Sequence, residues 1–233
     1  MNIETIFSLN FKIFNKTLRS IIPFILFYNI FVILISYFFE IENITYSIDT
    51  QLYTIIPLLS IYIIQLIYFI LITQFIFNKI NNTKIHFNII RIIKSLINII
   101  GLYLLIFIPP IIIITGLMSI NSGAFFLLGI IPILLFVTIF ANYLIINNQK
   151  NIIESIIGSY KIITNHLSET IILVMINIVF VFFVIIITAI GNQILPIILS
   201  SFLVNILNYF ISIFNIYFYY LLNSKFNRKN INE

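Results

Sequence analysis

The sequence predicts an all-α membrane protein with six transmembrane helices. Of its 233 residues, 61% are hydrophobic and only 8% are charged, whereas soluble domains contain about 25% charged residues. The mean hydropathy is +1.17. A bilayer core about 30 Å thick requires about 20 apolar helical residues, and the chain contains uncharged runs of that length. The predicted spans are residues 21–39, 52–77, 96–117, 125–146, 171–190 and 195–222.

The first run is predicted to be an uncleaved span rather than a secretory signal. Basic residues precede residues 21–39, as they precede a signal peptide. The run is longer than a typical signal h-region of about 7–15 residues, however, and no A-x-A cleavage site follows it. We therefore assign all six spans to a single polytopic domain covering residues 1–233.

The charges in the connecting segments predict the orientation. All Lys and Arg residues lie before span one, between spans two and three, between spans four and five, or after span six. The opposite side contains Glu40, Glu42 and Asp49 and no basic residue. By the positive-inside rule the N- and C-termini are cytoplasmic. The A/T-rich codons of the favoured residues indicate a bacterium, and we expect a multi-pass protein of the cell inner (cytoplasmic) membrane.

Each pair of spans follows a segment with the pattern of an amphipathic helix. The pattern begins near Ile3, near Ile85 and near Glu154. In the third segment the apolar face comprises Ile156, Tyr160, Ile163 and Leu167. The sequence thus predicts three transmembrane hairpins, each preceded by an interfacial amphipathic helix.

The basic faces of these segments predict contacts with anionic lipid headgroups. Packing of the apolar faces on neighbouring spans is the alternative, and both arrangements are compatible with the pattern. The expected headgroup contacts are Lys12, Lys16, Arg19, Lys84, Arg91, Lys94 and Lys161.

No residue pattern predicts catalysis. The chain has no Cys, which excludes disulfides and thiolate chemistry. His86 and His166 lie outside the spans, and no His pair has metal-ligand spacing. We expect no catalytic residue, no cofactor, no metal and no nucleic-acid partner, because the basic residues lie beside apolar spans rather than in one patch.

The last span has a polar face formed at spacings of four and three residues, which places its members on one side of a helix. Polar amides that face lipid are unfavourable, so this face is expected to bond to other helices or to a second copy of the chain. A water-lined passage is the alternative. Tyr209 is the tyrosine deep enough to require a buried partner. The polar face comprises Ser201, Asn205, Asn208, Ser212 and Asn215.

Residues 152–167, which include Ser155, Ser159 and Lys161, resemble the YciC family of bacterial inner-membrane proteins. The shared features are two small residues about four apart, a basic residue and a polar pair before span five, together with the six-span layout. Residues 129–132 read Gly-Ile-Ile-Pro, whereas the family usually has Pro before Gly there. The resemblance implies an inner-membrane location and no known activity.

These patterns predict a non-enzymatic envelope protein that organises the membrane or interacts with other components. Its expected partners are membrane lipids and a second copy of the chain or another membrane protein. The alternative is a transporter, or a transporter component, for a small neutral or amphiphilic solute. Kinks at Pro109, Pro110 and Pro132 are compatible with either reading.

Overall fold

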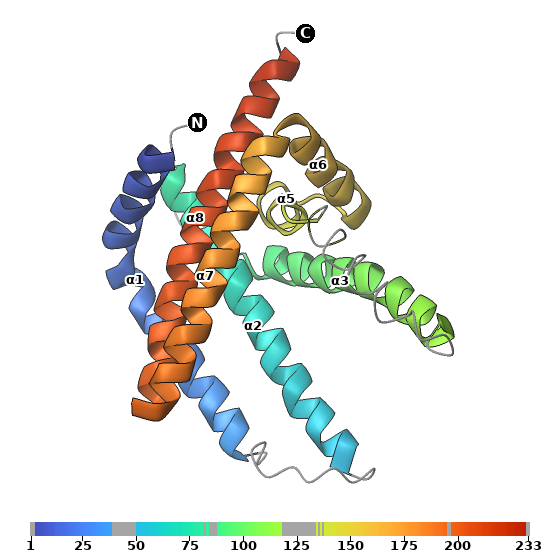
Figure 1. Cartoon of the computed structure of the whole chain (residues 1–233). Coiled ribbons are helices and arrows are strands. Elements are labelled where there is room, and N and C mark those ends of the chain that lie inside the picture. The colour runs from blue at the N-terminus through green and yellow to red at the C-terminus, as the bar shows by residue number, and fades with distance from the viewer. Residues whose placement is uncertain are drawn as a thin grey trace. The chain divides into compact units, whose positions relative to one another are not determined.

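The computed structural model describes residues 3–38, 50–81, 83, 88–117, 134, 136, 138–194 and 197–231. This described part is helical (Figure 1). Its five longest apolar helical stretches meet the length and composition needed to cross a membrane, so the chain is a membrane protein. The helices are α1 Ile3–Phe38, α2 Thr50–Ile80, α3 Ile89–Leu117, α5 Ala141–Asn148, α6 Ile152–Asn165, α7 Leu167–Ile194 and α8 Ile197–Ile231.

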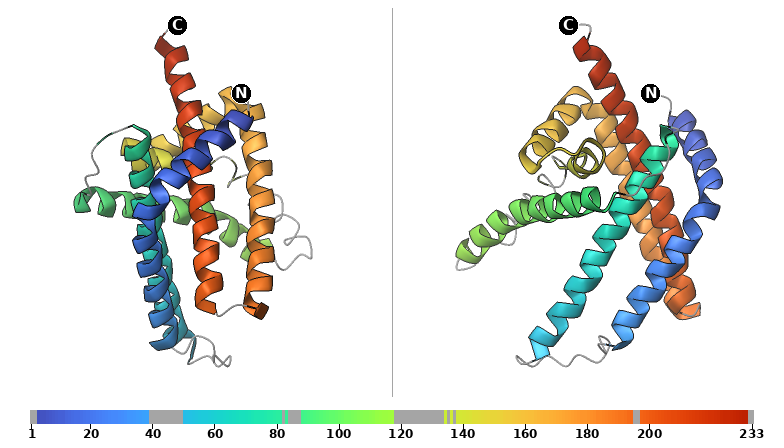
Figure 2. Two further views of the ribbon diagram at one scale, coloured as in Figure 1. Left: turned by 90° about the vertical axis from the view of Figure 1, so that its left-hand side faces the viewer. Right: turned by 180° about the vertical axis from the view of Figure 1, so that it is seen from behind.

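The chain divides into two compact units. The first unit comprises residues 1–72 and 171–218, and the second comprises residues 73–170 and 219–233. The first therefore contains α1, most of α2 and most of α7 and α8, whose courses can be followed in Figure 2. The second contains α3, α5 and α6 with the remaining ends of the long helices.

The first two amphipathic segments are continuous with the spans that follow them. α1 runs without a break from Ile3 to Phe38, past Pro23, and α3 begins at Ile89 and continues to Leu117. The described part of each segment thus forms one helix with the span that follows it, and the interfacial position of these segments stays a prediction. Helical bonding continues because neither junction contains a terminating Gly or an N-cap residue whose side chain bonds the next turn.

The fourth predicted span, residues 125–146, lies mostly outside the described residues. Its described end is not one regular helix, since Ala141 N–H donates to the carbonyl of Thr138, three residues back, at 2.9 Å. The Thr138 hydroxyl donates to the carbonyl of Leu134 at 2.8 Å, a local bond that often bends helices. The Phe140 N–H instead donates to Ser159 Oγ of α6 at 3.2 Å. Side-chain hydroxyls thus interrupt the helical pattern before α5.

The third amphipathic segment forms a distinct helix, α6, with its own caps. The Asn151 side chain accepts a hydrogen bond from Glu154 N–H at 2.9 Å. At the other end, His166 N–H donates to the carbonyls of Ile162 and Ile163, while its backbone leaves the helical region. An N-cap acceptor and a non-helical C-cap residue therefore separate α6 from its neighbours.

Replacing Asn151 by alanine is expected to destabilise the protein by about 1 kcal/mol, because the N–H of Glu154 loses its acceptor. The free energy of unfolding in detergent, followed by circular dichroism, measures this change. Asn151→Asp retains an acceptor oxygen and should keep most of the stability. Equal losses in both variants would show that the cap bond does not stabilise α6.

In the second unit, glycines lie where side chains of neighbouring helices approach closely. A Cβ atom added at Gly101 of α3 would lie 2.6 Å from Ile152 Cδ1, and one added at Gly158 of α6 would lie 2.9 Å from Leu144 Cδ1. Ser155 and Ser159 of α6 are fully buried. Small residues allow helices to pack closely where the bilayer provides no hydrophobic driving force.

Aromatic side chains join α1, α7 and α8 in the first unit. The ring of Phe7 lies 5.0 Å from that of Phe214 and 6.4 Å from that of Phe180, between centroids. Phe14 meets Phe210 edge-on at 5.4 Å. These distances are those of favourable aromatic pairs, so Phe7 and Phe14 of α1 pack on other helices in this unit.

Candidate functional site

The polar face of α8 (Ser201, Asn205, Asn208, Ser212 and Asn215) bonds to α1 through one buried amide. Asn29 of α1 is 3% exposed. Its Oδ1 accepts hydrogen bonds from Ser201 Oγ at 2.7 Å and from Asn205 Nδ2 at 2.9 Å, and its Nδ2 donates to the carbonyl of Ile25 at 2.8 Å. Asn29 therefore connects two helices and leaves little of its amide unpaired.

A reciprocal amide pair connects α7 to α8. Asn177 Nδ2 donates to Asn215 Oδ1 at 2.8 Å, and Asn215 Nδ2 donates to Asn177 Oδ1 at 2.9 Å. Asn177 Nδ2 also donates to the carbonyl of Leu173. Two hydrogen bonds between the same two side chains fix the register of α7 against α8.

Tyr209 lies on α8 beside this face and is 1% exposed. Its hydroxyl donates to Thr17 Oγ1 of α1 at 2.7 Å, and the Thr17 hydroxyl donates to the carbonyl of Ile13 at 2.7 Å. The buried partner that the depth of Tyr209 requires is thus a threonine of the first helix.

Asn208 and Ser212 line a cavity of about 270 Å³ within the first unit. Tyr28 and Tyr68 stack beside it with ring centroids 4.5 Å apart. The hydroxyl of Tyr68 is buried and has no hydrogen-bond partner among the described residues. The lining side chains are neutral, and they are Tyr28, Gln65, Tyr68, Phe69, Ile72, Asn205, Asn208, Tyr209, Ile211 and Ser212.

Most of the basic residues expected at lipid headgroups are exposed in the structure. This holds for Lys12, Lys16 and Arg19 of α1, Lys94 of α3 and Lys161 of α6. Lys84 lies outside the described residues.

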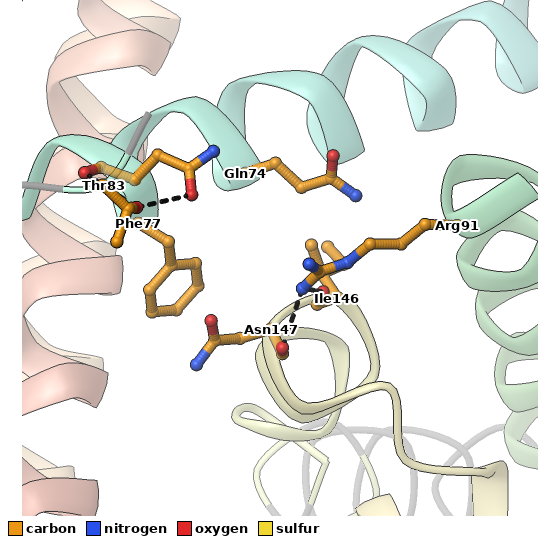
Figure 3. A pocket seen from close by; sticks show the side chains of 7 residues that line it. Gln74, Phe77, Thr83, Arg91, Ile146 and Asn147 are labelled. Carbon is orange, nitrogen blue, oxygen red and sulfur yellow. Dashed lines mark hydrogen bonds between the residues drawn. The ribbon is translucent and has the colours of Figure 1, made fainter. Parts of the chain in front are cut away.

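Arg91 makes a different contact from the other basic residues. Its Nη2 donates to the carbonyls of Ile146 and Asn147, at 3.0 and 2.8 Å. These carbonyls end α5, so the guanidinium binds the negative end of a helix dipole. Figure 3 shows the side chain reaching the last turn of α5 from α3.

Arg91 also lines a cavity of about 260 Å³ within the second unit. The other lining residues come from the end of α2, the connection to α3 and the end of α5 (Figure 3). Thr83 Oγ1 donates to Asn78 Oδ1 at 3.0 Å. The full lining comprises Gln74, Phe77, Asn78, Thr83, Arg91, Ile146 and Asn147.

Sequence reasoning identifies the polar face of α8 but not its partners. Asn29, Asn177 and Thr17 are single polar residues within or beside apolar runs. That each is a lone polar residue among apolar ones is the sequence feature that could have identified them as partners, because a lone polar side chain within a span requires a partner on another helix. The pairing itself requires the helix arrangement.

The described residues offer no cluster of three or more His, Asp or Glu side chains that could hold a metal ion. The two cavities instead present neutral hydroxyls and amides in the first unit and a guanidinium with amides in the second. Such groups bind ligands through hydrogen bonds and charge. No family model, no curated protein and no solved structure matches this chain.

Proposed function

We propose that this chain is a non-enzymatic, multi-pass protein of the bacterial inner membrane that organises or contacts membrane components through its basic amphipathic segments. The observation that supports this role most directly is that residues of the α8 polar face bond to other helices. Ser201, Asn205 and Asn215 bond to other helices, which favours packing over a continuous path. The resemblance of residues 152–167 to the YciC family is compatible with the same membrane.

The outer surface of α6 provides the proposed membrane contact. Ile153, Ile157 and Tyr160 are 66%, 49% and 56% exposed, and their spacing places them on one side of the helix. Lys161, also exposed, adjoins them. An exposed apolar stripe with an adjacent cation is typical of a helix that lies at the headgroup boundary.

A tryptophan placed at Tyr160 tests this contact, because the chain contains no other Trp. In vesicles containing brominated lipids, the fluorescence of Tyr160→Trp should be strongly quenched. Asn165→Trp is the matched control, since Asn165 is exposed on α6 but lies about 140° around the helix from residue 160. Equal quenching at the two positions would contradict an oriented interfacial helix.

The cavity in the first unit supports the second candidate, a transporter for a small neutral solute. Its neutral polar lining and its volume of about 270 Å³ would suit such a solute. Asn208 lines the cavity and is exposed, whereas Asn205 bonds to Asn29. Substitutions at these two positions therefore distinguish transport from packing.

In proteoliposomes that contain the full chain, a transporter should raise glycerol or urea flux, and Asn208→Leu should remove that flux while the protein stays folded. A packing role predicts no flux in either protein. It also predicts that Asn205→Leu lowers stability, whereas Asn208→Leu leaves it nearly unchanged. Flux that depends on Asn208 would replace the first proposal with the second.

The proposed orientation is testable because the chain has no Cys. A cysteine introduced at Asn121 should react with an impermeant maleimide added outside cells, and one introduced at Asn148 should react only after lysis. The reverse result would place the termini outside the cytoplasm.

A further inference from the structure

The cavity lined by Arg91 lies in a part of the chain without acidic residues. Residues 50–153 contain no Asp or Glu. In the second unit, the described carboxylates belong to Glu154, which is exposed, and to Glu169, which lies 4.0 Å from the His166 ring nitrogen. Excess positive charge raises the local concentration of anions, so the electrostatics of this unit favour an anionic ligand.

Two buried donors in the cavity lack acceptors. Gln74 of α2 is 5% exposed, and its Nε2 has no hydrogen-bond partner within the described chain; the same is true of Arg91 Nε. Figure 3 shows both side chains extending from their helices toward the same space. Buried polar groups are nearly always hydrogen-bonded, so these donors indicate an acceptor that the surrounding residues do not supply.

Three acceptors of the cavity lining are already engaged. The carbonyls of Ile146 and Asn147 accept from Arg91 Nη2, and Asn78 Oδ1 accepts from Thr83 Oγ1. The bonds to α5 hold the guanidinium in position without neutralising its charge. A fixed guanidinium beside an amide N–H suits oxygen atoms of phosphate, which accept several charge-assisted hydrogen bonds.

We propose that this cavity binds a phosphate group, with Arg91 and Gln74 donating to its oxygens. The group belongs either to inorganic phosphate or to the phosphomonoester headgroup of an anionic lipid. The end of α2 and the start of α3 flank the segment predicted to be cytoplasmic, where both sources are present. The inference does not depend on the role proposed above, because it concerns one fixed site rather than a basic surface.

The free-phosphate arm uses the full-length protein in detergent. Phosphate should raise the thermal unfolding midpoint of the wild-type chain above that in chloride at equal ionic strength, because a ligand that binds the folded state stabilises it. Gln74→Leu should weaken phosphate binding by about tenfold or more, the effect of losing one hydrogen bond to a charged group. Gln65→Leu, a change of the same type on the same helix, should leave binding unchanged.

The lipid arm uses the protein in nanodiscs that contain phosphatidic acid or only phosphatidylcholine. If the phosphate group belongs to a lipid, native mass spectrometry should detect retained phosphatidic acid on the wild-type chain and much less on Gln74→Leu. Arg91→Gln should lose the ligand as well. Lys79→Gln removes an equal charge at an exposed position of α2 in the same unit. It lies outside the cavity lining and outside the expected headgroup contacts, and it should retain the ligand.

The proposal is supported if phosphate stabilisation or phosphatidic acid retention is lost in Gln74→Leu but kept in Gln65→Leu. The arm in which this happens shows whether the phosphate group comes from free phosphate or from a lipid. Gln74→Leu preserves the Arg91 bonds to α5, so it tests the site even if Arg91→Gln does not fold. Absence of binding in both arms, or equal binding by the wild-type chain and Gln74→Leu, would overturn the proposal and leave Arg91 as a cap of α5 only.

Discussion

Replacing Asn29 by leucine is expected to destabilise the protein by about 1–3 kcal/mol, the cost of leaving buried polar partners unpaired. One oxygen, Asn29 Oδ1, accepts from both Ser201 and Asn205. Leucine has a similar volume but no acceptor, so both donors on α8 would lose their partner on α1. Unfolding in mixed micelles of increasing dodecyl sulfate content, followed by circular dichroism, measures the loss.

The matched control is Asn15→Leu, which changes the same residue type on the same helix at an exposed position. It should alter stability by less than about 0.5 kcal/mol. Interhelical hydrogen bonds in membranes average about 0.6 kcal/mol, so the expected cost exceeds one average bond because two donors are affected. Equal effects of the two substitutions would show that the Asn29 bonds do not hold α1 to α8.

Replacing Gly158 by leucine is expected to cost about 1–3 kcal/mol or more, the range for overpacking a closely packed interface. The Cβ atom alone would lie 2.9 Å from Leu144 Cδ1 and 3.6 Å from Lys150 Nζ, so the Leu144 side chain must move to admit the new side chain. We expect α6 to separate from α5, with a lower midpoint of thermal unfolding.

Trypsin cleavage provides a second measurement of this change, because Lys150 precedes α6 and should become accessible when α5 and α6 separate. Ile153→Phe is the control, since Ile153 is 66% exposed and added volume there meets no neighbour. If Gly158→Leu were as stable as Ile153→Phe, close packing at Gly158 would not determine the position of α6.

The helical class and the apolar helices were predictable because charge avoidance and length are properties of the sequence alone. The boundary between an amphipathic segment and a span was less predictable, since both are helical and differ only in surroundings. α6 is separate because Asn151 caps it and His166 ends it. α1 has the same type of pattern without such signals and continues to Phe38.

The candidate site was predictable on one helix and unpredictable between helices. The spacing of Ser201, Asn205 and Asn215 gives their common face from helical geometry. Their partners, Asn29 and Asn177, lie 172 to 176 and 38 residues away in sequence. The sequence assigns Arg91 a wider role than its contacts show. Its place on a basic face predicts a lipid contact, and its bonds to the end of α5 become evident only from the arrangement of the helices.

The bonds between α1 and α8 have a consequence for biosynthesis. Asn29 and Ser201 are 172 residues apart, and Thr17 and Tyr209 are 192 apart. At about 5–20 residues per second, roughly 10–40 s pass between synthesis of the first helix and synthesis of its partner. During that interval the Asn29 amide can bond to the Ile25 carbonyl, and Thr17 to the Ile13 carbonyl, within α1 itself. The donors of both side chains are therefore paired within the first helix from the outset, whereas the acceptors, Asn29 Oδ1 and Thr17 Oγ1, gain their partners only once the last helix has been made.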